Sequence, residues 1–282
     1  MNYQWYPGHM TKAKRMMQEN IKLIDLVIEL VDARIPMSSR NPDIDELAKN
    51  KSRVILLNKS DLSDGAWNDK WTAYFEEKGF HVLKLNSKSG AGIKSVQSLV
   101  QEACKEKIER DRKRGIKNRP VRAMVVGIPN VGKSTFINSL AGKACTKTGN
   151  KPGVTKGKQW IRLNQNLELL DTPGILWPRF ENQSVGEKLA MIGSINDEIL
   201  HADELAVAII RFMQANYPGL LEKRYEIEST EDVYEFLKAV CISRHCFLKG
   251  QEPDIARASK MIIDDFRSGR SGRVTLEFPE EW

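Results

Sequence analysis

Residues 127–135 read Gly-Ile-Pro-Asn-Val-Gly-Lys-Ser-Thr. This matches the pattern Gly-x-x-x-x-Gly-Lys-Ser, in which backbone N–H groups converge on phosphate oxygens at the start of a helix. Lys133 would neutralise the β- and γ-phosphates and Ser134 would ligate Mg²⁺. The other expected phosphate contacts are Asn130, Val131, Gly132 and Thr135. An ordinary glycine turn is the less favoured interpretation, because a strand-like run precedes the motif and a helix-like run follows it.

Two further loops follow the phosphate motif and carry residues suited to the metal and the γ-phosphate. In Asp-Thr-Pro-Gly (171–174), Asp171 can reach Mg²⁺ through water, and the N–H of Gly174 can bind the γ-phosphate. In Pro-Gly-Val-Thr (152–155), Thr155 is the expected ligand of both Mg²⁺ and the γ-phosphate. Each segment alone is weak evidence, because turns use the same residue types.

Residues 58–61, Asn-Lys-Ser-Asp, are typical of a loop that reads guanine. The Asp61 carboxylate would accept hydrogen bonds from guanine N1–H and its exocyclic amine, a donor pair that adenine lacks. The aliphatic stem of Lys59 can lie on the ring face. Asn86 and Ser87 begin Asn-Ser-Lys-Ser-Gly, which offers backbone N–H groups near guanine O6, although a plain turn explains that segment equally well. Together these residues predict binding of GTP and GDP.

The elements that position these loops read as an α/β domain. Near-continuous apolar runs predict buried parallel strands at 23–33, 53–58, 81–86 and 121–127, and 159–163 with 167–171 predicts a hairpin. Six strands with interleaved helices indicate a mostly parallel, doubly wound sheet. A charge-rich helix is expected to run on from residue 92 into a linker that ends at Pro120.

The spacing of the apolar residues changes after Pro178, where they recur at helical intervals. We therefore expect an α/β domain with a basic amino-terminal segment at 1–178 and a small all-helical domain at 179–282, with a frayed or extended tail at 273–278. Residues 1–178 hold 31 Lys and Arg against 18 Asp and Glu, whereas residues 179–282 hold 13 against 19. The basic first part and the acidic second part support two modules.

The base-reading loop precedes the phosphate loop, which reverses the usual order. Circular permutation explains this, because domain termini often lie close together and can be rejoined without changing the sheet. The order of motifs, with the flanks Trp-Tyr-Pro-Gly-His-Met (5–10), 32–42 and 171–178, resembles the ribosome biogenesis GTPase A (YlqF) family of circularly permuted GTPases. The resemblance implies a slow GTPase that acts late in assembly of the large (50S) ribosomal subunit, binds ribosomal RNA and is stimulated by the particle.

The residue that positions the attacking water is not supplied by the usual motif. Signalling GTPases place glutamine where this chain has Ile175. Either a partner completes the site or His9 accepts a hydrogen bond from water, and the alternative for His9 is a role in its turn or in RNA contact. Asn130 resembles the residue that holds K⁺ beside the phosphates in potassium-dependent GTPases.

Composition supports a polyanionic partner: the net charge is +7 and the pI is about 9.1. Three basic segments, 9–15, 109–119 and 257–273, are candidate RNA contacts, and Trp5 and Tyr6 could stack on bases. The cysteines Cys104, Cys145, Cys241 and Cys246 suggest a reduced cytoplasm, and Cys241, His245 and Cys246 lack a standard zinc spacing. With no apolar run long enough to span a membrane, we expect a cytoplasmic protein. We also expect a monomer.

Two other functions stay open on the sequence. One is a signalling-type GTPase whose helical domain binds a protein partner, although no lipidation motif is present. The other is an ATP-dependent enzyme that uses the phosphate loop alone. Asp61 distinguishes guanine from adenine use, and cosedimentation with ribosomal subunits distinguishes a ribosomal from a signalling role.

Overall fold

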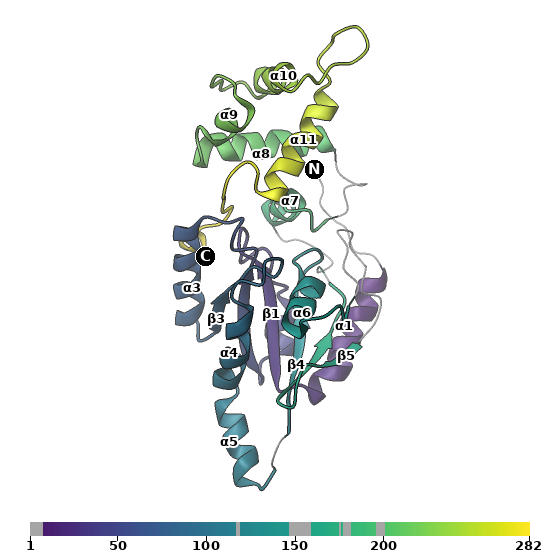
Figure 1. Ribbon diagram of the computed structural model, residues 1–282, viewed down its shortest axis with the longest axis vertical. Coiled ribbons are helices and arrows are strands. Elements are labelled where there is room, and N and C mark those ends of the chain that lie inside the picture. The colour runs from purple at the N-terminus through teal and green to yellow at the C-terminus, as the bar shows by residue number, and fades with distance from the viewer. Residues whose placement is uncertain (1–7, 117–118, 147–158, 175, 177–181, 196–200) are drawn as a thin grey trace. The chain divides into compact units, whose positions relative to one another are not determined.

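The computed structural model describes residues 8–116, 119–146, 159–174, 176, 182–195 and 201–282, without the side chains of residues 8–10 and 13. The chain divides into two compact units (Figure 1). The first comprises Met1–Gln183 and Thr275–Trp282, and the second comprises Ser184–Val274. The carboxyl-terminal residues therefore belong to the first unit.

The first unit is built on a six-stranded sheet in the order β3-β2-β1-β4-β6-β5. The strands are β1 (Leu26–Asp32), β2 (Ser52–Asn58), β3 (His81–Lys84), β4 (Val121–Val126), β5 (Gln159–Arg162) and β6 (Leu167–Asp171). All neighbours pair in parallel except β5 and β6, which form an antiparallel hairpin. The predicted fold class, a six-stranded and mostly parallel sheet, is confirmed.

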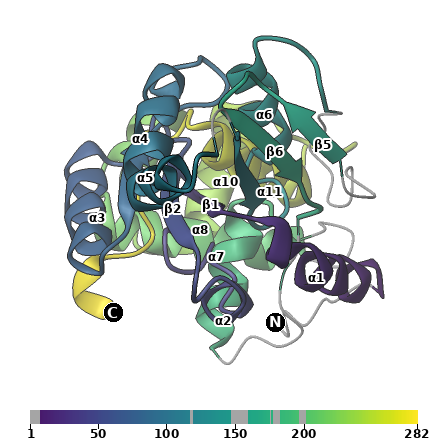
Figure 2. The ribbon, with the colours of Figure 1, turned by 90° about the horizontal axis from the view of Figure 1, so that it is seen from below.

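Helices cover both faces of this sheet. They are α1 (Gly8–Asn20), α2 (Asp43–Leu47), α3 (Gly65–Glu77), α4 (Val96–Ala103), α5 (Lys105–Lys113) and α6 (Lys133–Ala141), with short 3-10 turns η1 (Ile21–Leu23), η2 (Ile93–Ser95) and η4 (Pro279–Glu281). Figure 2 shows α4 and α6 on one side of the sheet and α1 and α2 on the other. Trp71 and Phe75 of α3 pack against Val31, Ile55 and Leu57, so alternate residues of β2 face this core.

The helix predicted to continue from residue 92 is instead interrupted. At Cys104, between α4 and α5, the backbone has φ −107° and ψ 12°, outside regular helical geometry. The Cys104 side chain is buried, and the following α5 has no buried residue. Apolar packing thus holds α4 against the sheet, whereas α5 carries charged side chains on a more exposed segment.

The carboxyl-terminal tail packs against the first unit, so the expectation of a frayed tail is wrong. The N–H of Leu276 donates to the carbonyl of Arg34 at 2.8 Å, and the indole N–H of Trp71 donates to the carbonyl of Glu277 at 3.0 Å. The rings of Trp67 and Phe278 lie 4.5 Å apart. Helical and strand patterns do not reveal such a tail, because its partners are distant in the sequence.

The second unit is helical. It contains α7 (Gln183–Met191), α8 (Ala202–Asn216), α9 (Leu220–Tyr225), α10 (Val233–Ser243) and α11 (Ile255–Ser268). The buried Asp265 of α11 accepts hydrogen bonds from Arg224 Nε at 2.7 Å, Tyr225 Oη at 3.2 Å and Arg270 Nε at 2.6 Å. Burial opposes ionisation of this carboxyl, but the two guanidinium groups prevail and lower its pKa.

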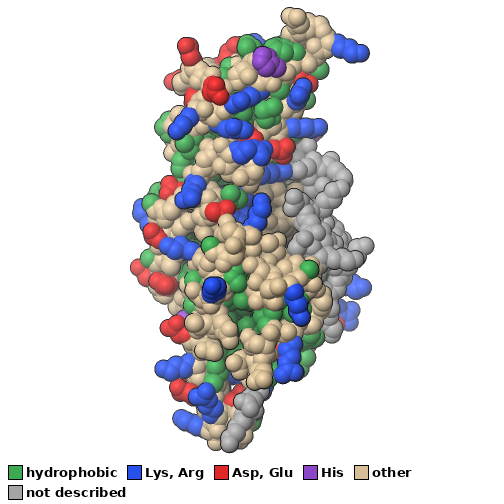
Figure 3. Space-filling model, viewed as in Figure 1, with side chains coloured by type: hydrophobic (Ala, Val, Ile, Leu, Met, Phe, Trp, Pro, Cys, Tyr) green, Lys and Arg blue, Asp and Glu red, His purple; other side chains and the backbone are tan. Residues whose placement is uncertain are grey.

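Basic and acidic side chains are interspersed on the face shown in Figure 3. Among the described residues, every helix is too short or too polar to span a bilayer. The same residues form no cluster of His, Cys, Asp and Glu that could hold a metal ion, Cys241, His245 and Cys246 included.

Candidate nucleotide-binding site

The candidate site lies where parallel strands end. β2, β4 and β6 run in the same direction, with β1 between β2 and β4. The loops that follow them therefore leave the same edge of the sheet, which is where open α/β sheets bind ligands. The base-reading loop follows β2, the phosphate loop follows β4, and the segment from Asp171 to Gly174 begins at the end of β6.

Two glycines in these loops are required by close contacts. Gly132 has a φ of 101°, and a Cβ atom there would lie 2.5 Å from Asn58 Nδ2. A Cβ atom on Gly174 would lie 2.9 Å from Lys133 Nζ and 2.9 Å from the backbone of Pro129. Larger residues would push the phosphate loop away from the base-reading loop and from the end of β6.

Lys133 begins α6 and is held inside the phosphate loop. Its ammonium donates to the carbonyls of Gly127 at 3.1 Å and Ile128 at 3.4 Å. Burial lowers its pKa to about 8, although the charge of Asp171 opposes this shift. A buried cation with so little compensating charge is suited to an anionic ligand such as a phosphate group.

Asp171 at the end of β6 is buried, and neither carboxylate oxygen has a hydrogen-bond partner among the described residues. Burial raises its pKa to about 6, with the Lys133 ammonium acting in the opposite direction. Two unpartnered buried oxygens are costly unless a cation compensates them. They fit a Mg²⁺ ion, reached directly or through water, as does the hydroxyl of the half-buried Ser134 in the first turn of α6.

Asn58 joins the base-reading loop to the phosphate loop. Its Nδ2 donates to the carbonyl of Val131 at 2.7 Å. Its Oδ1 accepts from the backbone N–H of Ser87 at 3.0 Å and from Ser87 Oγ at 2.8 Å. One amide side chain therefore holds three loops together, although their motifs stand in reversed order along the chain.

Lys59 makes a second connection between the same loops. Its ammonium donates to the carbonyl of Asn130 at 2.8 Å and lies 3.0 Å from Asp32 Oδ2. Lys59 and Asn130 both have a positive φ of 58°. Both residues that form this contact between the loops therefore have a left-handed backbone conformation.

The remaining base-reading residues differ in how they are held. Asp61 is exposed, which leaves its carboxylate available to a base. Ser60 supports the loop, because its N–H and Oγ both donate to the carbonyl of Leu85, at 3.2 and 3.0 Å. Asn86 Oδ1 accepts from the N–H groups of Lys88 and Ser89, so this side chain shapes its own turn.

Several predicted site residues lie outside the described residues. Thr155 and Ile175 belong to this group, as do Trp5 and Tyr6. His9 lies in the first turn of α1, and its side chain is not among those described. Their proposed roles stay predictions.

The structure adds two residues to which the sequence motifs assigned no role at the site. Asp32, at the end of β1, is buried beside Lys59, and Arg34 is buried beside Asp32. Burial opposes ionisation of Asp32, but the charges of Arg34 and Lys59 prevail and hold its pKa well below its usual range. The only sequence signal for them was that two charged residues, Asp32 and Arg34, stand where an apolar strand ends.

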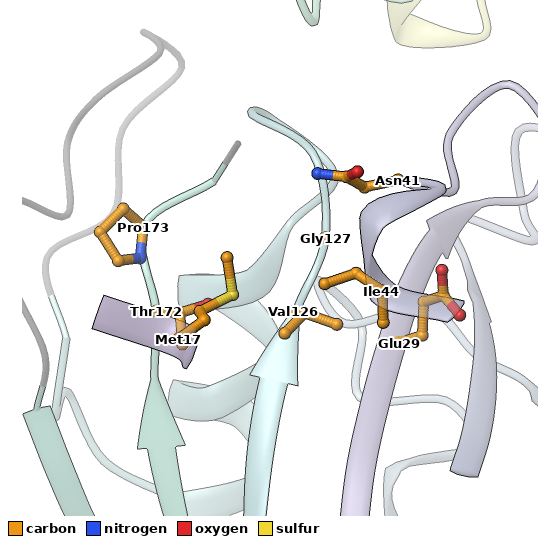
Figure 4. A pocket seen from close by; sticks show the side chains of 8 residues that line it. All are labelled: Met17, Glu29, Asn41, Ile44, Val126, Gly127, Thr172 and Pro173. Atoms are coloured by element: carbon orange, nitrogen blue, oxygen red, sulfur yellow. The ribbon is translucent and has the colours of Figure 1, made fainter. Parts of the chain in front are cut away.

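Figure 4 shows a small hollow beside the phosphate loop, lined by Met17, Glu29, Asn41, Ile44, Val126, Gly127, Thr172 and Pro173. Asn41 is buried, and its Nδ2 has no hydrogen-bond partner among the described residues. Met17 places α1 next to the segment that follows β6. The hollow is too tight for a nucleotide, and it shows that the amino-terminal helix borders the phosphate side of the site.

A family model described as "50S ribosome-binding GTPase" matches residues 122–242. The match begins in β4, so the base-reading loop precedes it, in agreement with the permuted order. "Ribosome biogenesis GTPase A" of Bacillus cereus is 47% identical over 283 residues, covering 100% of this chain and 96% of the relative. "Mitochondrial ribosome-associated GTPase 1" of Mus musculus is 36% identical, covering 97% of this chain and 90% of the relative.

Solved structures agree with these sequence relatives. YlqF from Thermotoga maritima with bound GNP superposes with a TM-score of 0.67 at 30% identity, covering 95% of this chain and 99% of the other. The GDP-bound structure of the same protein gives a TM-score of 0.69 at 28% identity, covering 94% of this chain and 99% of the other.

Proposed function

Since this chain belongs to the ribosome biogenesis GTPase A family and is a GTPase, we propose that it acts at a late step in maturation of the 50S ribosomal subunit. The likeness to relatives named ribosome biogenesis GTPase A carries the ribosomal role, and the hydrogen bonds from Asn58 and Lys59 to the phosphate loop carry the GTP site. They support one pocket for the base and the phosphates. GTP would bind there and be hydrolysed to GDP and phosphate.

The nucleotide contacts follow from the position of each loop. Asp61 selects guanine, Lys59 lies on the base, and Ser87 with Asn86 borders O6. The backbone from Asn130 to Thr135 cradles the phosphates, with Lys133 supplying charge, and the N–H of Gly174 meets the γ-phosphate. A Cβ atom added at Gly174 would lie 2.9 Å from Lys133 Nζ, which supports this because it shows that the two residues are close together.

Metal ions complete the phosphate side in this proposal. Ser134, Thr155 and Asp171 would hold Mg²⁺, which supplies charge neutralisation of the phosphates. The unpartnered oxygens of Asp171 support its part in the metal site. A K⁺ ion beside Asn130 would add positive charge during hydrolysis, and equal rates in sodium and potassium buffers would exclude it.

We assign the orientation of the attacking water to His9, because Ile175 can neither orient nor polarise it. The position of Met17 beside Thr172 and Pro173 supports this role, since it anchors α1 next to the segment that follows β6. α1 leads through η1 into the start of β1, and this connection, together with Met17, supports placing the first turn of α1 on the side of the nucleotide. Intrinsic hydrolysis would be slow until the ribosomal particle stimulates it.

Binding to ribosomal RNA is proposed for the basic surfaces of both units. Arg110, Arg112, Lys113 and Arg114 are exposed at the end of α5, and Arg257 and Lys260 are exposed on α11. Arg267 has another task, because its guanidinium donates to the carbonyls of Met191 at 3.1 Å and Ala190 at 2.7 Å. The exposed groups are therefore the better candidates for phosphate contacts.

Cosedimentation tests the proposal. The protein is incubated with purified 50S subunits in the presence of a non-hydrolysable GTP analogue, GDP or no nucleotide. We expect the analogue to promote association, and we expect subunits to accelerate GTP turnover, with both effects weakened by salt. Failure to sediment in any nucleotide state would exclude a function on the large subunit.

We further propose that the protein acts as a monomer in the cytoplasm, where these particles mature.

A further inference from the structure

The loop that follows β1 carries none of the recognised nucleotide motifs, yet Asp32, where it begins, forms an ion pair with Lys59. Asp32 Oδ2 lies 3.0 Å from Lys59 Nζ, and the same carboxylate accepts from Arg34 Nε and Nη2 at 2.9 Å each. Lys59 Nζ also donates to Asn130 in the phosphate loop. The ammonium of Lys59 is therefore positioned from two sides, by Asp32 and by the phosphate loop.

The same loop is held at its other end by the carboxyl terminus of the chain. Glu277 is fully buried, and its carboxylate accepts from the N–H of Met37 at 2.8 Å and of Ser38 at 3.1 Å. The hydroxyl of Ser38 donates to it as well. Ser39 then links the loop back to the strand, because its Oγ accepts from the N–H of Asp32 at 3.0 Å.

A second contact connects the tail with the base-reading side. Thr275 Oγ1 accepts from the N–H of Asp64 at 3.2 Å. Asp64 caps α3 and stands just after Asp61 in the chain. Figures 1 and 2 both show the carboxyl-terminal segment beside α3. The tail thus contacts the loop that follows β1 and also the segment that follows the base-reading loop, which contains Lys59.

We propose that Glu277 is a positioning residue for the guanine nucleotide, acting through residues 37–39, Asp32 and Lys59. The inference rests on the proposed nucleotide site. A buried carboxylate that accepts hydrogen bonds from several N–H and O–H groups is hard to replace. Glutamine keeps one acceptor oxygen, and its NH₂ group would face N–H donors, with which it cannot form hydrogen bonds. Loss of Glu277 would relax the loop and, with it, the side-chain position of Lys59.

The test compares Glu277→Gln with Glu280→Gln, which alters an exposed glutamate 3.4 Å from Lys70 Nζ. We expect Glu277→Gln to raise the Kd for GDP about 3- to 10-fold, a coupling typical of residues that act through a contact network. Glu280→Gln should leave the Kd unchanged. Val100→Ala, in the buried core of α4, controls for a general loss of stability, and should lower the Tm without changing the Kd.

A double-mutant cycle separates positioning from structural damage. If Glu277 acts through Lys59, the effect of Glu277→Gln on the Kd disappears in a Lys59→Met background. An equal factor in both backgrounds, or a wild-type Kd for Glu277→Gln, overturns the proposal. Lys133→Ala is measured alongside, because unimpaired GDP binding by that variant would overturn the nucleotide site itself.

Discussion

Asn58 Nδ2 lies 2.7 Å from the carbonyl oxygen of Val131, although 73 residues separate the two in the chain. This hydrogen bond joins the base-reading half of the site to the phosphate-binding half. In a permuted chain the two halves are written in reversed order, and such contacts bring them together in space.

Asn58→Ala removes the connection while Lys59, Asp61 and the phosphate loop keep their own side chains. Val131 and Ser87 lose their buried partner, so we expect GDP affinity to fall about 10- to 100-fold. Fluorescent-nucleotide titration measures this, with Gln165→Ala in the exposed β5–β6 turn as a control. Unchanged affinity would show that the two halves hold their positions without Asn58.

Asp61→Asn should change the base rather than the fold. An amide can pair with xanthine, whereas it no longer accepts both donors of guanine, so GDP affinity should fall roughly 100-fold or more while xanthosine diphosphate binding rises. Because Asp61 is exposed, the Tm should stay the same. Equal losses for both nucleotides would contradict its role in base selection.

His9→Ala tests the positioning of the water. GTP affinity should be retained, while turnover stimulated by the 50S particle should drop by about 100-fold or more, the usual contribution of a general base. Single-turnover hydrolysis at saturating particle concentration is the measurement, with Gln18→Ala at an exposed position of the same helix as a control. Unchanged turnover would remove His9 from the mechanism.

Asp32→Asn should destabilise the first unit in a pH-dependent way. Its carboxyl has a lowered pKa in the folded protein, so its contribution is complete above the ordinary value of about 4 and is lost as the pH falls below it. At neutral pH the substitution removes the negative charge that the buried Arg34 guanidinium contacts at 2.9 Å, at a cost of about 3 to 5 kcal/mol.

Urea unfolding measures this difference between pH 7 and pH 3. All six tryptophans belong to the first unit, so tryptophan fluorescence follows that unit alone. The gap in free energy of unfolding between wild type and Asp32→Asn should narrow at acid pH. A gap that is constant across the range would mean that the Asp32 charge is not what stabilises the loop.

The four free cysteines should differ in reactivity. Burial raises the pKa of Cys104 to about 11, and Cys241 and Cys246 are also buried, whereas Cys145 is half-buried. At pH 8 about one Cys104 thiol in a thousand would be ionised. A thiol reagent should therefore modify Cys145 first and reach the other three only on unfolding. Rapid modification of Cys104 in the native protein would contradict its packing against the sheet.

The sequence alone determined the strands that carry the phosphate and base-reading loops, and it predicted the chemistry of those loops. It could do so because a glycine-rich loop, an apolar strand and a turn are each written in a few consecutive residues. The break at Cys104 was not predicted, since α4 and α5 are both helix-prone and only packing against the sheet distinguishes them.

The tertiary structure decided how these loops are held. Glu277 reaches Met37 across 240 residues, and Asp32 reaches Lys59 from a neighbouring strand. No local pattern encodes either contact, because a charged residue reads as solvent-exposed until the fold buries it beside its partner. The physical reason is that hydrogen bonds and ion pairs depend on distances in space, which strand order and loop packing set only after the chain has folded.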